Sequence, residues 1–205
     1  SKSDAELHEL SFVKEMLDLL EEGGTGIAII PVSCVITPSK AKSEILKHHT
    51  LKAVMSMPSE LFYPVGTVTC IVVFEAHKPH MRDEIVDINT GKVISPKKPY
   101  KKTWFGYWRE DGFIKTKHMG RIDLYNKWGE IKERWLEQFH NNEVHASESV
   151  TQYVTDDDEW IAEAYLETDY SKITQSDFEK VVRDYAMFKL LSEHGILSSS
   201  NSEEE

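Results

Sequence analysis

Residues 51–75, LKAVMSMPSELFYPVGTVTCIVVFE, constrain the fold more than any other part of the sequence. Two apolar runs, residues 51–57 and 68–74, carry β-branched side chains and are bounded by a proline and a glycine, a pattern typical of strand, loop and strand. About ten residues connect them, whereas a parallel crossover usually needs a dozen or more, so antiparallel pairing is predicted. The loop then lies at one end of a sheet and displays side chains that loops normally avoid: Leu61, Phe62 and Tyr63.

Another strand and a helix are predicted upstream of this segment. Residues 27–31 form a continuous apolar run, and residues 39–48 have the pattern of a helix with Ser39 as its N-cap. A strand, a helix and a strand in this order form a βαβ unit, whose strands at 27–31 and 51–57 run parallel. The sequence therefore predicts an α/β sheet that contains one antiparallel strand.

This arrangement resembles the carboxyl-terminal half of the Rossmann-like sheet in S-adenosylmethionine-dependent methyltransferases. The residues are also similar to those of one family, in FVKEMLDLLEEGGTGIAIIP at 12–31, the segment at 51–75, KKTWFGYWREDGFIKTKHMGRID at 101–123 and DEWIAEAYLETDYSKITQSDFEK at 158–180. Up to about Leu191, the chain resembles the M subunit of type I restriction-modification DNA adenine methyltransferases. The resemblance implies a carboxyl-terminal fragment, in which a half-sheet with one antiparallel strand is followed by a β-hairpin and a helical region.

The motifs with which this family binds the methyl donor and the target amino group are absent from the sequence. The family uses a glycine-rich turn after the first strand and an Asn-Pro-Pro-aromatic motif, but the sequence has no Asn-Pro and no Pro-Pro pair. A nucleoside-binding turn follows a strand and opens a helix, whereas a predicted helix precedes Gly24 and Gly26 and a strand follows them. We interpret Gly23 and Gly24 as a helix C-cap. The resemblance implies S-adenosylmethionine as cofactor of the full-length enzyme, and we expect no cofactor and no catalytic residue in this chain.

The sequence predicts four successive pieces. They are the carboxyl half of the catalytic domain (1–95), a basic and aromatic hairpin plus helix (96–146), a helical assembly region (147–197) and a disordered acidic tail (198–205).

Charge and periodicity predict the elements within these pieces. An apolar stripe predicts a helix at 6–20, and alternation around the Asp111-Gly112 turn predicts a hairpin at 102–115. Three further helices are predicted, at 124–141, after the acidic residues 156–158, and after a cap at Thr174 or Ser176.

Phe62 is the candidate for contact with the target base. An enzyme that modifies a base within a duplex must extrude it, and an aromatic face restores part of the lost stacking. Phe62 precedes the predicted antiparallel strand, where, by resemblance, related amino-methyltransferases place an aromatic residue against the flipped adenine; Tyr63 is the alternative. A purely structural role stays open, in which Leu61 and Phe62 plug the end of the sheet.

Basic and aromatic residues are interleaved between residues 97 and 121. Six lysines are candidates for contacts with DNA phosphates: Lys97, Lys98, Lys101, Lys102, Lys115 and Lys117. They are equally consistent with protection of an exposed hairpin edge. We predict no metal site, because the histidines lack a second cluster of ligands and both cysteines, Cys34 and Cys70, lie in or beside apolar runs.

The net charge bears on the partners of the protein. The 205 residues carry a formal charge of −11, which opposes nonspecific attraction to DNA, so a DNA contact must come from a local patch or from partner subunits. By resemblance, the partners are DNA, a specificity subunit and a restriction subunit, and the unpaired strand at 27–31 predicts self-association. No apolar run has membrane-spanning length, and we expect a cytoplasmic protein without membrane contact. A noncatalytic binding or scaffold module is the competing class.

Overall fold

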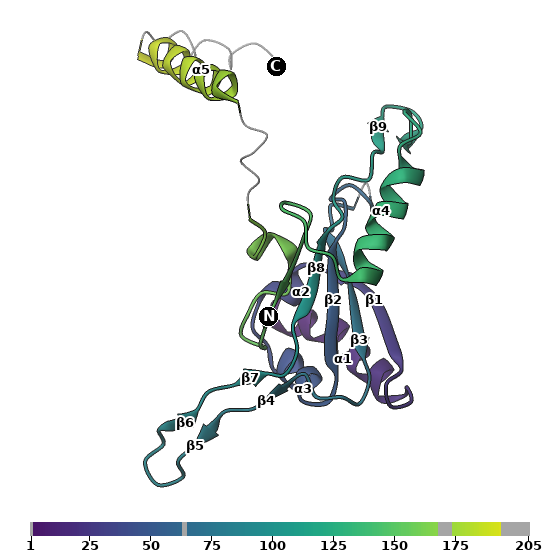
Figure 1. Cartoon of the computed structure of the whole chain (residues 1–205), viewed down its shortest axis with the longest axis vertical. Coiled ribbons are helices and arrows are strands. Elements are labelled where there is room, and N and C mark those ends of the chain that lie inside the picture. The colour runs from purple at the N-terminus through teal and green to yellow at the C-terminus, as the bar shows by residue number, and fades with distance from the viewer. Residues whose placement is uncertain (1, 63–64, 168–173, 194–205) are drawn as a thin grey trace. The chain divides into compact units, whose positions relative to one another are not determined.

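The computed structural model describes residues 2–62, 65–167 and 174–193 (Figure 1). The chain divides into two compact units, Ser1–Glu167 and Thr168–Glu205. The first unit contains the sheet, and the described part of the second is a single helix.

Five strands form the main sheet in the order β1-β3-β2-β8-β11 (Figure 1). They are β1 (Thr25–Pro31), β2 (Thr50–Ser56), β3 (Thr69–Glu75), β8 (Thr103–Tyr107) and β11 (Ser149–Gln152). β3 runs antiparallel to both β1 and β2, β2 runs parallel to β8, and β11 pairs antiparallel with β8. Because β1, β2 and β8 therefore share one direction, their carboxyl ends meet at one edge of the sheet.

The predicted α/β class is confirmed, and so are the predicted directions of the first three strands. β1 and β2 are parallel and β3 is antiparallel, but β3 lies between them and pairs along its whole length with β1, from Thr25 opposite Glu75 to Pro31 opposite Thr69. β1 is consequently the edge strand.

Three helices cover one face of the sheet: α1 (Lys2–Asp18), α2 (Ser33–Ile36) and α3 (Lys40–His48). The predicted stripe of α1 places Leu10, Val13 and Leu17 in the core, where each is almost fully buried. The predicted cap of α3 is confirmed, because the Ser39 hydroxyl accepts a hydrogen bond from the Lys42 amide at 3.2 Å.

The predicted glycine C-cap of the first helix is misplaced. α1 ends at Asp18, before the glycines. Gly23 has a φ of 77°, which favours glycine, but it lies in the turn into β1, where its amide donates to the Ala76 carbonyl at 2.9 Å.

Helix α4 (Trp128–Asn141) covers part of the opposite face through tryptophans. Trp135 of α4 stacks on Trp108, with ring centroids 5.2 Å apart, and Trp104 below them packs against Phe139. The predicted helix started at residue 124, four residues too early. The chain first turns at Asp123, whose carboxylate accepts from the amides of Lys127 and Trp128 and so fixes the start of α4.

Two predictions for the carboxyl-terminal half are wrong. The segment at 102–115 is not a hairpin, because β8 pairs with β2 and β11 inside the main sheet, and the hairpin is instead formed by β9 (Ile114–Thr116) and β10 (Gly120–Ile122). No helix starts at 156–158 either. That segment is irregular up to the 3-10 helix η1 (Ala162–Ala164), because it packs Trp160 into the core beneath the sheet.

An extended arm leaves the sheet at the end opposite α4 (Figure 1). It consists of two short ladders, β4 (Met81–Arg82) with β7 (Lys98–Pro99) and β5 (Ile85–Val86) with β6 (Val93–Ser95). Each strand of these ladders has only two or three residues. The sequence therefore contains no apolar run that is long enough to predict them.

Helix α5 (Gln175–Glu193) is the described part of the second unit. Its predicted cap at Thr174 is confirmed by reciprocal hydrogen bonds, because the Asp177 carboxylate accepts from the Thr174 amide and the Thr174 hydroxyl from the Asp177 amide. The helix exposes an apolar stripe that contains Phe178, Val181, Val182, Tyr185 and Phe188. The predicted acidic tail at 198–205 lies outside the described residues. Within the described part of the chain, no helix combines the length and apolarity that crossing a bilayer requires.

Candidate functional site

The loop that follows β2 lies at the edge where the carboxyl ends of β1, β2 and β8 meet. In open α/β sheets, ligands bind in the crevice outside the carboxyl ends of the strands. Pro58 is buried at the base of this loop, whereas Leu61 and Phe62 are 38% and 44% exposed. Tyr63, the alternative aromatic residue, lies outside the described residues.

A polar cluster holds the start of this loop. The buried Ser56 hydroxyl, at the end of β2, donates to the Glu163 carboxylate of η1 at 2.5 Å. Glu163 also forms an ion pair with Arg109, whose guanidinium reaches the Met57 carbonyl at 3.5 Å. The cluster therefore ties β2, the segment after β8 and η1 together at the point where the loop starts.

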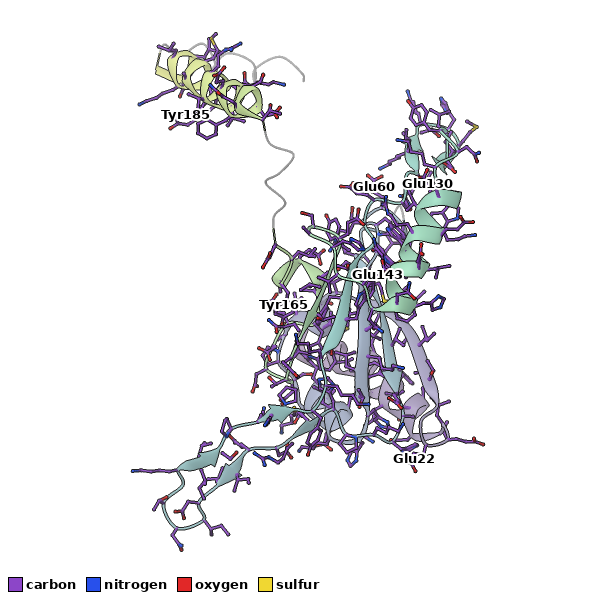
Figure 2. All side chains as sticks on the ribbon, in the orientation of Figure 1. Glu22, Glu60, Glu130, Glu143, Tyr165 and Tyr185 are labelled. Atoms are coloured by element: carbon purple, nitrogen blue, oxygen red, sulfur yellow. The ribbon has the colours of Figure 1, made fainter. Side chains whose placement is uncertain are left out.

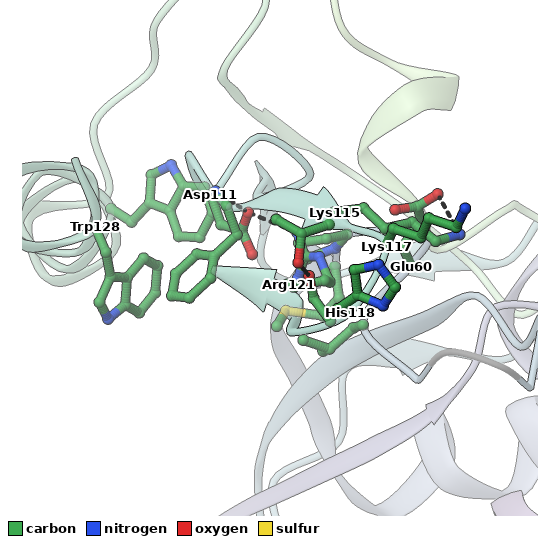
Figure 3. Close-up of a pocket in the computed structure, with 14 residues that line it drawn as sticks. Glu60, Asp111, Lys115, Lys117, His118, Arg121 and Trp128 are labelled. Atoms are coloured by element: carbon green, nitrogen blue, oxygen red, sulfur yellow. Dashed lines mark hydrogen bonds and ion pairs between the residues drawn. The ribbon is translucent and has the colours of Figure 1, made fainter. Parts of the chain in front are cut away.

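A pocket of about 750 Å³ opens beside the loop (Figure 3). The 57–61 loop, the β9–β10 hairpin and the first turns of α4 form its walls. Phe113, Trp128 and Trp135 supply aromatic surface, with the Phe113 and Trp128 rings at 5.9 Å in an edge-to-face arrangement. Figure 2 shows Glu60 at this end of the sheet beside α4, and Glu22 at the opposite end.

Two ion pairs shape the pocket. The Arg121 guanidinium donates to the buried Asp111 carboxylate at 2.7 Å and lies 5.6 Å from the Phe113 ring. The Lys115 ammonium lies 3.5 Å from the Glu60 carboxylate and joins the hairpin to the loop across exposed surface. Lys117 and His118 lie on the exposed turn between β9 and β10 (Figure 3).

The structure separates the six candidate lysines into two groups. Lys115 and Lys117 line the pocket. The other four lie at the opposite end of the sheet, before the start of β8: Lys97, Lys98, Lys101 and Lys102.

Intramolecular contacts occupy three lysines of the second group. Lys97 donates to both Asp156 and Asp157 at 2.7–2.8 Å, and Lys101 lies 3.9 Å from Glu75. Lys102 lies 5.6 Å from the Tyr153 ring. The six lysines therefore do not form one basic patch, and their predicted phosphate contacts stay a prediction.

The glycine segment does not have the geometry of a cofactor turn. α1 precedes it and β1 follows it. A Cβ atom at Gly26 would lie 2.4 Å from the Leu17 side chain, so this glycine allows α1 to pack closely against β1. The segment therefore does not fit S-adenosylmethionine.

Burial shifts the pKa of one cysteine and of one histidine. Cys34 and Cys70 are buried, and burial raises the pKa of the Cys70 thiol to about 12, which keeps it protonated at neutral pH. His49 is buried, and burial lowers its pKa. Across the described ranges, no group of three His, Cys, Asp or Glu side chains could hold a metal ion.

The sequence interpretation missed the Ser56–Glu163–Arg109 cluster and the aromatic wall of the pocket. Glu163 lies 107 residues from Ser56 in the sequence, and no local motif marks either residue. The spacing of Trp128 and Trp135 on one helix face does signal burial, but tertiary packing sets their partners, which are Trp108 just after β8 and Phe113 just before β9.

Comparisons with known proteins match nearly the whole chain. The model of the N-6 DNA Methylase family matches residues 2–194. A curated relative, the type II restriction enzyme and methyltransferase RM.BcgI from Heyndrickxia coagulans, is 28% identical over 196 residues, which are 92% of this chain and 28% of the relative.

A solved structure shows the same fold. The methyltransferase subunit of a type I restriction-modification system from Streptococcus thermophilus matches 77% of this chain and 30% of its own length, with a TM-score of 0.52 and 12% identity. A modification subunit from Vibrio vulnificus YJ016 matches 79% of this chain and 32% of its own, with a TM-score of 0.47 and 11% identity. The chain thus spans less than a third of the length of these proteins.

Proposed function

Because the chain belongs to the N-6 DNA methylase family, we propose that it is the carboxyl-terminal part of a DNA methyltransferase subunit of a type I restriction-modification system. The complete enzyme transfers a methyl group from S-adenosylmethionine to N6 of adenine. A specificity subunit selects the DNA sequence, and a restriction subunit joins for cleavage. The family match and the fold of a type I methyltransferase subunit support this proposal.

The observation that carries the proposal is the exposed Phe62 ring in the loop that follows the carboxyl end of β2. A residue that only plugs the sheet would lose most of its surface, but 44% of Phe62 stays accessible. Base extrusion costs stacking energy, and an accessible aromatic face next to the catalytic centre restores part of it. In the proposed enzyme, Phe62 is the platform for the flipped adenine.

The rest of the site positions this platform. The Ser56–Glu163–Arg109 cluster fixes the end of β2 from which the loop starts. The methyl donor and the adenine amino group are held by the part of the enzyme that this chain does not contain. On this proposal, the isolated chain binds no S-adenosylmethionine and transfers no methyl group.

Helix α5 is suited to assembly with another subunit. Its exposed residues at 178, 181, 182, 185 and 188 repeat with a spacing of three or four, which places them on one face. Such an apolar face is the usual means by which a helix docks in a groove or bundle of a partner.

A substitution of Phe62 in the complete enzyme tests the proposal. Phe62→Ala should lower methyl transfer to adenine roughly tenfold to a hundredfold, because the loss of stacking costs about 1–3 kcal/mol per base. DNA affinity should change much less, since most of it comes from phosphate contacts and the specificity subunit. Phe62→Trp should keep much of the activity because it keeps an aromatic face.

The measurements separate extrusion from chemistry. Formation of N6-methyladenine reports transfer, and a fluorescent base analogue at the target position reports extrusion. Val65→Ala is the matched control, because Val65 is exposed in the same loop and has no aromatic face. If Phe62→Ala only lowers the melting temperature and leaves extrusion intact, the ring is a plug, and Tyr63 is the next residue to test.

A further inference from the structure

The pocket beside the Phe62 loop has aromatic side chains on one side and basic side chains on the other (Figure 3). Trp128 is half-buried at its wall, and Trp135, 6% exposed, lies at its base. Basic side chains stand at the opposite side, on the β9–β10 hairpin (Figure 3). A nucleotide presents the matching pair of groups, a planar base and an anionic phosphate.

The charge of the pocket differs from that of the chain. Three permanently charged basic residues line it, Lys115, Lys117 and Arg121, against two carboxylates, Glu60 and Asp111. The chain as a whole carries −11. Arg121 and Asp111 are paired with each other and Lys115 contacts Glu60, whereas Lys117 lies exposed on the turn at the rim, where it can meet an anion.

The pocket lies next to the loop that carries the proposed base platform, Phe62. Leu61, the neighbour of Phe62, lines the pocket, and Glu60 of the same loop contacts Lys115 of the hairpin. A DNA strand whose target base lies on Phe62 would therefore pass the pocket within one or two nucleotides, because consecutive phosphates follow the strand continuously.

We propose that this pocket binds an unpaired nucleotide that flanks the target adenine on the same DNA strand. Its base packs against Trp128, and its phosphate lies at Lys117 and His118. This inference rests on the proposed function, because it takes the strand that Phe62 receives as the ligand. The cavity of about 750 Å³ lies within the range of about 300–1,000 Å³ of sites that enclose small ligands.

Binding of a short fluorescent single-stranded oligodeoxynucleotide to the 205-residue chain tests this site. Lys117→Glu should weaken binding and reduce the slope of log affinity against log salt concentration by about 0.7, the value for one phosphate contact on a single strand. Trp128→Leu should weaken binding about tenfold or more, and Trp128→Phe should keep most of it. The matched control is Lys92→Glu, which makes the same charge change at an exposed position on the arm.

A cross-link locates the contact independently of affinity. An oligonucleotide with 5-iododeoxyuridine should cross-link to the peptide that contains Trp128, which also covers the case in which Trp128→Leu fails to fold. Cross-links confined to other peptides, equal loss in Lys92→Glu, or equal affinity for a duplex of the same sequence would each overturn the proposal.

The two proposals fail in different ways. If Lys117→Glu and Trp128→Leu leave DNA binding unchanged while the complete enzyme methylates adenine, the pocket assignment fails and the function stands. If the oligonucleotide binds at Trp128 but the complete enzyme makes no N6-methyladenine, the enzymatic function fails.

Discussion

The buried Lys42 side chain joins the helical layer to the segment that leads to the candidate site, and its protonation gives a testable prediction of stability. Its side chain is fully buried in α3, and its ammonium donates to the carbonyls of Val35 at 3.1 Å and Asp158 at 2.6 Å. The same ammonium lies 4.5 Å from the centroid of the Trp160 ring. This one charge therefore links α2 and α3 to the segment that continues into η1 and Glu163.

Burial determines the protonation of Lys42. Loss of hydration lowers its pKa from 10.5 to about 8, although the nearby carboxylates of Asp156 and Asp158 oppose the shift. Between pH 8 and 10.5 the unfolded chain holds a proton at this lysine that the folded chain has lost, so stability rises with pH in this window. At 1.36 kcal/mol per pKa unit, the shift corresponds to a rise of about 3 kcal/mol.

Lys42→Met isolates this contribution, because methionine fills a similar volume and does not titrate. The free energy of unfolding would be measured by urea denaturation from pH 7.5 to 10.5 for both proteins. We expect the difference, wild type minus Lys42→Met, to rise by about 3 kcal/mol across this window. Lys40→Met removes an exposed lysine from the same helix, and its curve should stay parallel to the wild type. Parallel curves for Lys42→Met as well would refute the argument that burial depresses this pKa.

Two further predictions concern the chain by itself. The 205-residue chain should show no methyl transfer and no tight S-adenosylmethionine binding in a calorimetric titration; micromolar binding would return the segment from Gly24 to Gly26 to consideration as a cofactor turn. The chain should also self-associate in size-exclusion chromatography with light scattering, because the edge strand β1 leaves Ile27 and Ile29 59% and 57% exposed. A stable monomer that binds no hydrophobic dye would contradict this second expectation.

The elements that the sequence predicted correctly are those whose signals are local. Ser39 lies directly before an amphipathic run, and the apolar runs of β2 and β3 are bounded by Pro58 and Gly66. The same reasoning failed for β8, because alternation identifies a strand and not its partner. The chain does bend at Gly112, but the bend leads away from the main sheet into β9 rather than back along β8 (Figure 1).

At the candidate site, Phe62 was marked by a local signal, whereas the pocket depends on tertiary structure. Phe62 could be singled out because an aromatic side chain in a short loop between two strands is unusual, and its exposure agrees with that interpretation. The pocket could not be predicted, because the positions of the loop, the hairpin and α4 relative to one another depend on the pairing of β8 within the main sheet. The lysines were identified as a group by their spacing, and only the topology separates Lys115 and Lys117 from the other four.

In the proposed function, this separation gives the acidic charge of the chain a physical role in DNA binding. At the end of the sheet opposite the pocket, Asp156 and Asp157 neutralise Lys97, and Glu75 lies near Lys101. Phosphate groups gain little there, and the net charge of −11 repels DNA from the remaining surface. In that proposal, the nucleotide site is the face on which a local excess of positive charge lies beside the half-buried Trp128 ring, and the electrostatic field orients the strand toward Phe62 instead of adding general affinity.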